Sequence, residues 1–171
     1  MPNKTPKVKE ENSFDVFDVS NYFISLSLKN KIDKNVVEGV TNLKLQKILY
    51  FAQCAYLSLY NKELFSDEIV AWQYGPVVRS VYHKYSDFVN NTLELPKNYD
   101  SSLSVDIKKF LDGIWELFSK YSARELVNIT HSHKPWMDAY ATGIGSVIDK
   151  SVLASYYKGI FKFQEDGESN A

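Results

Sequence analysis

The sequence feature that most constrains the fold is an apolar repeat between Leu45 and Leu59. Its apolar side chains recur at steps of three and four residues: Leu45, Ile48, Leu49, Ala52, Ala55, Tyr56 and Leu59. This spacing has the period of an α-helix that buries one face. Thr41 or Asn42 can cap the start of the helix, and Asn61 is a suitable stop. We therefore expect this helix to be a core element of the domain.

The same helical period is found in several other segments. Apolar stripes begin at Val16 and at Ile107, and Pro135 can start a short helix. The run Ser122-Ala-Arg-Glu125 has the pattern of a capping box, which predicts a separate helix from Ala123. A last helix is predicted over residues 150–162, with these side chains buried: Val152, Leu153, Tyr156, Tyr157 and Ile160. The sequence thus predicts a mainly α fold, a compact single-domain bundle of six to seven helices with at most one or two very short strands.

The segment around Gly75 and Pro76 interrupts the helical pattern. Residues 64–74 are predicted to be extended. Pro76 fits the first turn of a new helix, where its missing N–H costs no hydrogen bond, and this helix is expected to end near Tyr85. The sequence therefore predicts a fixed corner between an extended segment and a helix.

Length and charge limit the class of protein. A chain of 171 residues suits one domain, here residues 14–163, between a polar lead (1–13) and a polar tail (164–171) that are predicted to be disordered. The 20 basic and 21 acidic side chains disfavour a nucleic-acid partner, because phosphate binding usually requires a basic excess. The polar N-terminus, a single cysteine and apolar runs shorter than the roughly 18 residues of a membrane span predict a cytoplasmic protein without a membrane partner.

Candidate groups for metal binding or catalysis are few. His131 and His133 form an H-x-H pair at a predicted helix end, and His83 and Cys54 stand alone. The sequence has no Cys-x-x-Cys, H-E-x-x-H, dinucleotide or Walker A motif. We interpret His131 as a helix-ending residue, His133 as solvated and Cys54 as a small buried apolar residue. The prediction is a protein that is not an enzyme and that holds no metal or cofactor.

Aromatic residues are concentrated around the Gly75-Pro76 corner. Trp, Tyr and Arg dominate the residues that contribute most to protein–protein binding, so this corner is a candidate binding surface. The candidate partner-binding residues are Trp72, Tyr74, Arg79, Tyr82 and His83. Arg79 is expected to point outward, whereas Trp72 can face either the core or a partner. We expect Trp115 and Trp136 to lie in the core.

Three stretches of the sequence together resemble the Panacea antitoxin family, also called SocA-like or phage-associated GepA-like proteins. They are "LKLQKILYFAQ", "IVAWQYGPVVRSVY" and "YSARELVNITHSHKPW", and the likeness extends from about Phe17 to Ile160. The residues that match the family pattern, and to which we assign a structural role, are Leu45, Gln46, Lys47, Tyr50, Trp72, Gly75, Pro76, Val77, His131, Pro135 and Trp136.

The resemblance implies a mostly helical antitoxin that is not an enzyme and that binds a cognate toxin protein encoded nearby. Some members of this family act instead as adaptors that present a toxin to a protease, so a protease complex is a second possible partner. Two further hypotheses come from the residues alone: an enzyme that uses His131, His133 or Cys54, and a nucleic-acid-binding regulator. The enzyme hypothesis requires a polar pocket with converging acid or base groups, and the regulator hypothesis requires a continuous basic stripe.

Overall fold

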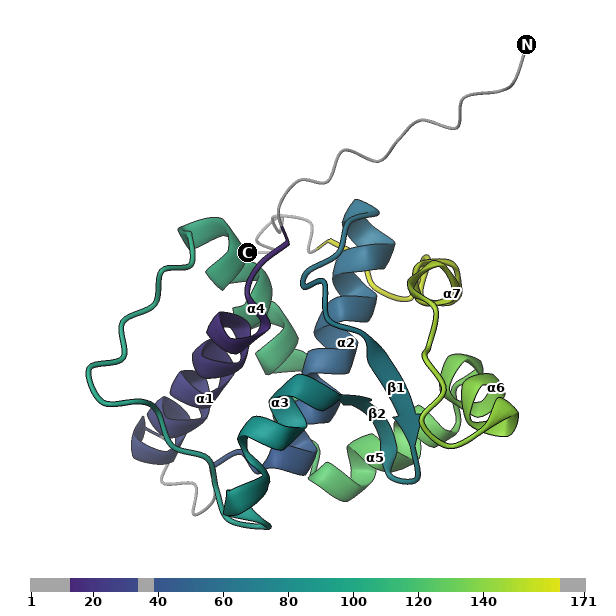
Figure 1. Cartoon of the computed structure of the whole chain (residues 1–171). Helices are drawn as coiled ribbons and strands as arrows, with labels where there is room; N and C mark the ends of the chain where they lie inside the picture. The colour runs from purple at the N-terminus through teal and green to yellow at the C-terminus, as the bar shows by residue number, and fades with distance from the viewer. Residues whose placement is uncertain (1–12, 34–38, 164–171) are drawn as a thin grey trace.

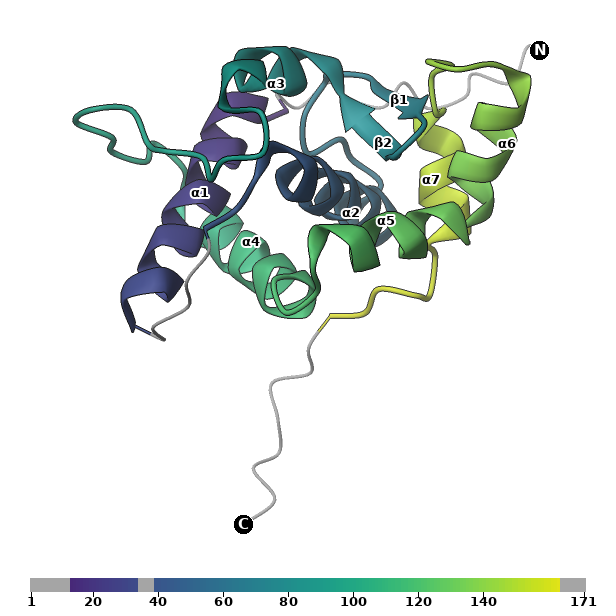
Figure 2. The same ribbon diagram turned by 90° about the horizontal axis from the view of Figure 1, so that it is seen from below.

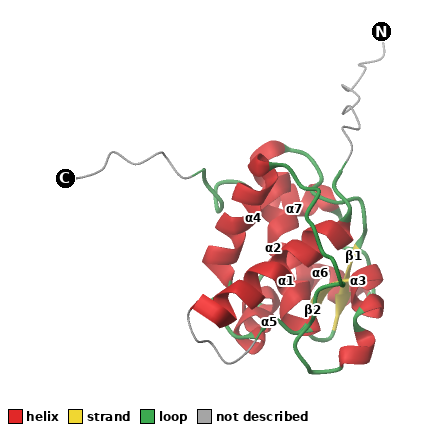
Figure 3. Ribbon diagram, turned by 90° about the vertical axis from the view of Figure 1, so that its left-hand side faces the viewer, coloured by secondary structure: helices red, strands yellow, loops and turns green. Residues whose placement is uncertain are grey.

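The computed structural model describes residues 13–33 and 39–163 of the chain. The mainly α class is confirmed, because helices predominate and one short pair of strands is the only sheet in these ranges (Figure 3). The elements are α1 (Val16–Asp33), α2 (Asn42–Tyr60), β1 (Ile69–Trp72), β2 (Gly75–Val78), α3 (Arg79–Lys84), a 3-10 helix (Ser86–Phe88), α4 (Val105–Phe118), α5 (Ala123–His131), α6 (Lys134–Thr142) and α7 (Lys150–Tyr156). Apart from Ser13, the predicted disordered lead and tail lie outside the described residues.

Helix α2 is the centre of the fold. In Figure 2 it lies between α1 and α4 on one side and α6 and α7 on the other, with the strands and α5 also packed around it. Thr41 caps its start, since the hydroxyl oxygen accepts a hydrogen bond of 3.3 Å from the Lys44 N–H. Asn61 ends it in a left-handed conformation (φ 53°). The apolar repeat is buried as predicted from Leu45 to Ala55, whereas Tyr56 and Leu59 are half-buried. The intervening polar residues Gln46, Lys47 and Gln53 are buried as well.

The first and fourth helices cover one side of α2. They lie side by side in Figures 1 and 2, and the Phe23 ring stacks on the Trp115 ring with 6.4 Å between centroids. Ile107, Leu111 and Ile114 bury one face of α4 at helical spacing. Trp115 and Trp136 are both buried, which confirms their predicted place in the core.

The capping box at the start of α5 is confirmed. The Ser122 hydroxyl accepts a hydrogen bond of 3.1 Å from the Glu125 N–H, and the Glu125 carboxylate accepts one of 2.6 Å from the Ser122 N–H. These bonds satisfy two N–H groups, one at the cap and one in the first turn, and separate α5 from α4. Pro135 lies in the first turn of α6, as predicted.

The predicted helix start at Pro76 is wrong. Residues 75–78 form the second strand of an antiparallel hairpin in the register Ile69↔Val78, Val70↔Val77, Ala71↔Pro76 and Trp72↔Gly75. The Ala71 N–H and C=O bond to Ser146 and Gly145, away from β2. Pro76, opposite Ala71, is therefore at a position where β1 requires no N–H donor. Helix α3 begins three residues later than predicted, at Arg79.

The last helix is also shorter than predicted. Helix α7 ends at Tyr156, because the chain turns after Tyr157 and Gly159 adopts a positive φ of 80°. Leu153 and Tyr157 are buried as expected, but Val152 and Ile160 are exposed. Within the described ranges, no helix combines the length and the apolar character needed to cross a membrane.

Candidate partner-binding groove at the hairpin

The β1–β2 hairpin is the element on which the candidate site is built, and its turn requires a glycine. Gly75 has a φ of 102°, a conformation that L side chains rarely adopt. A Cβ on Gly75 would lie 2.7 Å from Lys47 Cε and 2.8 Å from Thr130 Oγ1. Conformation and space therefore both exclude a side chain here, and the hairpin backbone lies directly against α2 and α5.

Two consecutive side chains of α2 bind the outer edge of β2. The Gln46 Oε1 atom accepts a hydrogen bond of 2.9 Å from the Val78 N–H. The Lys47 ammonium donates one of 2.9 Å to the Pro76 carbonyl oxygen. Unpaired backbone groups at the edge of a sheet invite pairing with another chain, and here the core helix satisfies them.

The tip of the hairpin is bound from the other side by α5 and α6. The Trp136 indole N–H donates a hydrogen bond of 3.0 Å to the Trp72 carbonyl oxygen. His131 Nε2 lies 3.0 Å from the Gln73 carbonyl oxygen, so Nε2 carries the proton in this contact. The His131 and Trp136 rings stack with 4.1 Å between centroids, which fixes both donors with respect to each other.

Five of the eleven residues that match the family pattern thus position the hairpin backbone. Gln46 and Lys47 bind one edge, His131 and Trp136 bind the tip, and Gly75 permits the close approach. Because four side chains from three helices fix a short hairpin, its outward side chains are presented in a defined arrangement.

Side chains of the hairpin, α2, α3 and the loop at Ile144 together line an apolar groove of about 300 Å³. It is lined by Leu43, Gln46, Trp72, Gln73, Tyr74, Val77, Tyr82 and Ile144. Tyr74 and Ile144 are 62% and 77% exposed, so this groove presents two large apolar side chains to solvent at one place. We call this surface the hairpin groove.

The predicted partner-binding residues lie together at this groove. Trp72, Tyr74 and Tyr82 line it, and the Trp72 ring meets the Tyr82 ring edge-on with 4.9 Å between centroids. His83 contacts Trp72 from the exposed end of α3, at 6.4 Å between centroids. Trp72 is half-buried, with its backbone held by the core and its ring on the groove.

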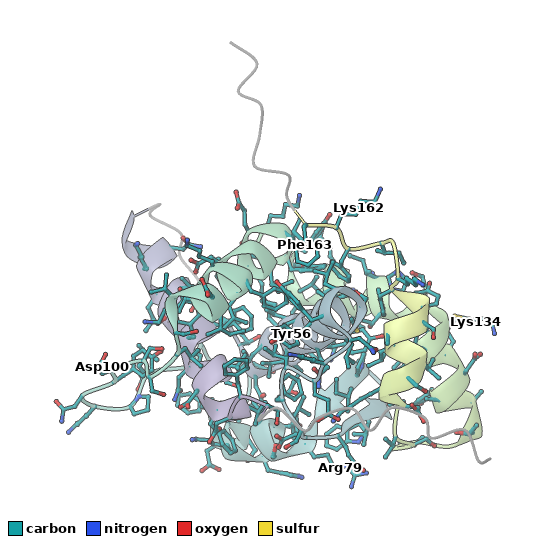
Figure 4. The ribbon with its side chains drawn as sticks, turned by 90° about the horizontal axis from the view of Figure 1, so that it is seen from above. Tyr56, Arg79, Asp100, Lys134, Lys162 and Phe163 are labelled. Carbon is teal, nitrogen blue, oxygen red and sulfur yellow. The ribbon has the colours of Figure 1, made fainter. Side chains whose placement is uncertain are left out.

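Arg79 points outward as predicted, which Figure 4 shows at the edge of the molecule. Its guanidinium donates a hydrogen bond of 3.2 Å to the Gly145 carbonyl oxygen. Arg79 therefore links α3 to the loop that carries Ile144, in addition to offering a charge to solvent.

Three groove residues were not predicted from the sequence: Leu43, Gln73 and Ile144. Leu43 lies in the first turn of α2, out of phase with the buried stripe. Its position in the sequence therefore did not indicate that it lines a groove. Ile144 stands between Gly143 and Gly145. An isoleucine between two glycines in a predicted turn could have indicated an exposed apolar side chain.

The histidine pair does not form a site. His131 bonds to the hairpin tip, whereas His133 Nδ1 lies 2.8 Å from the Tyr157 hydroxyl, on a different element. The interpretation of His133 as solvated is wrong, because it packs against Phe51 and Tyr157, and this burial lowers its pKa. Among the described residues, no group of three or more His, Cys, Asp and Glu side chains could hold a metal ion.

Cys54 lies at the centre of the molecule. It is completely buried on α2, and burial raises the pKa of its thiol well above the usual value. A nucleophilic cysteine needs access and a lowered pKa. Cys54 meets neither condition, so it fills space in the core, as interpreted from the sequence.

Comparison with known proteins connects this architecture to a family. The sequence pattern of the family described as "Antitoxin SocA-like, Panacea domain" matches residues 45–137, a range that contains all of the motif residues discussed above. The chain is also similar to Antitoxin SocA of Caulobacter vibrioides (strain NA1000 / CB15N), with 29% identity over 142 residues, covering 74% of this chain and 74% of that protein. No solved structure matches the chain.

Proposed function

The chain belongs to the SocA-like antitoxin family with a Panacea domain, and from that premise we propose that it neutralises a cognate toxin protein by binding it directly at the hairpin groove. Family membership supports an antitoxin role and a non-catalytic one. The toxin, which we expect to be encoded nearby, and the surface that binds it are the new elements of this proposal.

The observation that carries the proposal is the fixation of the hairpin by the family-pattern residues. Binding costs less free energy when the binding surface is already ordered, because fewer side chains and loops must be immobilised. Gln46, Lys47, His131 and Trp136 provide this order through four contacts to the hairpin backbone. A hairpin with a purely structural role requires no exposed Tyr74 at its tip, whereas a binding surface does.

The composition of the groove also suits a protein partner. Tyr and Trp supply large contact areas with few rotatable bonds, and binding energy concentrates on such residues. None of the residues that line the groove is an Asp, Glu, Lys or Arg, and charged residues are depleted at the centre of protein interfaces. Arg79 and His83 lie at its border, where charge favours orientation and encounter.

Co-expression with each product of the neighbouring genes tests the proposal. One of these products should arrest growth alone, and the wild-type chain should restore growth. Tyr74→Asp places a charge on the groove and should restore growth less well at equal soluble levels. Rescue equal to that of the wild type would exclude Tyr74 from the contact surface. If every neighbouring product is harmless when expressed alone, the antitoxin proposal is contradicted.

The steady-state level of the toxin separates direct neutralisation from presentation to a protease. Under the proposal, the toxin persists at an unchanged level while growth is restored, and it is recovered in a complex with the chain. A toxin that disappears only when the chain is present, and reappears in a host without the responsible protease, would favour the adaptor alternative.

A further inference from the structure

A second apolar surface lies on α4, away from the hairpin groove. The buried face of α4 packs on the core, whereas its opposite face borders a groove of about 700 Å³ that extends to the end of α2 and to residues 161–163. Three large apolar side chains on this groove are exposed: Tyr60, Leu117 and Phe163. A contiguous exposed apolar surface of this kind indicates an interaction site.

This surface is spatially separate from the hairpin groove. Leu43 on the hairpin groove and Tyr60 on the α4 groove are near opposite ends of α2, about 25 Å apart along a helix that rises about 1.5 Å per residue. In Figure 4, Phe163 and Lys162 lie on the opposite side of the molecule from Arg79. One surface can therefore be covered while the other stays free.

Four charged side chains on the outer face of α4 form two pairs of opposite sign, and each pair has one member before Gly113 and one after it. Asp106 and Lys109 precede it by seven and four residues, and Glu116 and Lys120 follow it by three and seven. All four line the α4 groove, Lys120 from just beyond the end of the helix. Each charge thus has a charge of opposite sign at nearly the same distance on the other side of the glycine.

From this pattern we propose that the occupant of the α4 surface is a second copy of this chain, packed with its α4 antiparallel to the first and crossing it at Gly113. A two-fold axis then brings Asp106 next to Lys120 of the second copy and Lys109 next to Glu116 of the second copy. A parallel arrangement would instead place like charges together. A symmetric dimer of identical chains requires a self-complementary surface, and this charge order supplies one.

The apolar residues of the face fit the same arrangement. At 100° per residue, Phe110 and Leu117 lie on one side of Gly113 around the helix, and Lys109 and Glu116 lie on the other. The two-fold axis places the apolar side of one helix against the apolar side of the other, so Phe110 meets Leu117 of the second copy. The charged sides face each other in the same way. This apolar contact provides affinity, while the exposed ion pairs set orientation, because such pairs contribute little energy alone.

Gly113 suits the crossing point. It is exposed, and a Cβ added there would meet no atom of the described residues within 4 Å, so nothing in the described part of the chain explains its lack of a side chain. A glycine at the crossing lets two helices approach to the lower end of the usual interaxial distance of about 8 to 10 Å. Asp112, next to it, is turned toward α1 and accepts a hydrogen bond of 2.6 Å from the Tyr22 hydroxyl.

A charge exchange tests the dimer by analytical ultracentrifugation over a concentration series of the purified full chain. The wild type should associate to a dimer. Lys109→Glu and Glu116→Lys should each weaken association at least about tenfold, because like charges then face each other. The double variant should recover association. A wild type that stays monomeric throughout, or a dimer that is insensitive to the single changes, would overturn the proposal.

Disulfide trapping tests the crossing point itself. Helices about 8 Å apart place the two Gly113 Cα atoms within about 4 to 6 Å, a distance that a disulfide can span. The chain has one cysteine, the buried Cys54, so Gly113→Cys introduces a single accessible thiol. Mild oxidation should convert this variant to a covalent dimer, whereas Val152→Cys on the exposed face of α7 should stay largely monomeric. Equal cross-linking of the two variants would reject a crossing at Gly113.

Discussion

Lys47 is completely buried, yet its ammonium reaches the Pro76 carbonyl oxygen at 2.9 Å. Burial lowers the pKa of Lys47 to about 7. This residue therefore joins the core helix to the candidate binding hairpin, and its charge is unfavourable in the folded state relative to the unfolded chain.

This relationship predicts a pH dependence of stability. Between about pH 7 and the usual lysine range near pH 10.5, the unfolded chain binds a proton at Lys47 that the folded chain releases. The contribution of Lys47 to the free energy of unfolding should therefore rise with pH across this window. Lys47→Met removes the titrating group. In urea titrations between pH 7 and pH 9, the free energy of unfolding of this variant should therefore rise less steeply with pH than that of the wild type. The exposed Lys134→Met is the matched control, and a rise of equal slope in both variants would contradict the assignment.

The two glycines at Gly75 and Gly113 should respond oppositely to alanine. Gly75→Ala should lower the free energy of unfolding by about 1 to 3 kcal/mol, because the added methyl clashes with Lys47 and Thr130 and φ is strained. Gly113→Ala should raise it by about 1 kcal/mol in dilute protein, since alanine favours a helix and finds open space. Chemical denaturation measures both, and a neutral Gly75→Ala would mean that the hairpin is free to move away from α2.

The core position of α2 predicts a large effect at Leu49. Leu49→Ala should cost about 2 to 5 kcal/mol, because buried contacts are lost and a cavity remains in a completely buried site. The exposed Leu117→Ala, measured at the same high dilution, should change stability by less than about 0.5 kcal/mol. A cost at Leu49 as small as that at Leu117 would argue against α2 as the centre of the core.

The capping box predicts a smaller, local effect. Ser122→Ala should cost about 1 kcal/mol, because the Glu125 N–H loses its acceptor. Glu125→Gln keeps a side-chain oxygen within reach of the Ser122 N–H and should cost less. Thermal unfolding of the two variants side by side gives the comparison, and a larger loss for Glu125→Gln would reverse the expected order.

Local signals predicted the parts of the fold that depend on neighbours in sequence. The apolar repeat of α2 and the Ser122–Glu125 box are both determined within one or two helical turns, and both are confirmed. The extended segment before Gly75 was also recognised. The prediction of six to seven helices followed from the sum of such signals, and the described residues form seven α-helices.

Long-range contacts account for what was missed. Pro76 satisfies the local rule for a first helical turn, but pairing with Ala71 and the bond to Lys47 place it in a strand. The buried polar pair Gln46 and Lys47 has backbone partners about thirty residues away, which no local pattern reveals. Val152 and Ile160 were predicted to be buried from their helical spacing, but both are exposed. Here a local pattern indicated burial, and no other element in the described part of the chain covers these side chains.

The candidate site was predicted in its aromatic residues and not in its shape. Trp72, Tyr74 and Tyr82 were selected as residue types that favour binding, and they line one groove. The contribution of Ile144 depends on a loop that bonds to the outer edge of β1, through Gly145 N–H to Ala71 C=O at 2.7 Å. Only the folded chain brings these residues together.

The central claim is that the hairpin groove binds the toxin, and calorimetric titration of the purified toxin into matched variants tests it most directly. Ile144→Asp and Ile160→Asp make the same change at isoleucines that are 77% and 57% exposed, one on the groove and one outside both grooves. Ile144→Asp should weaken binding at least about tenfold, because a charge without a partner is placed in an apolar contact. Ile160→Asp should bind as the wild type does. Wild-type affinity in Ile144→Asp, with the loss found in Ile160→Asp instead, would contradict the claim.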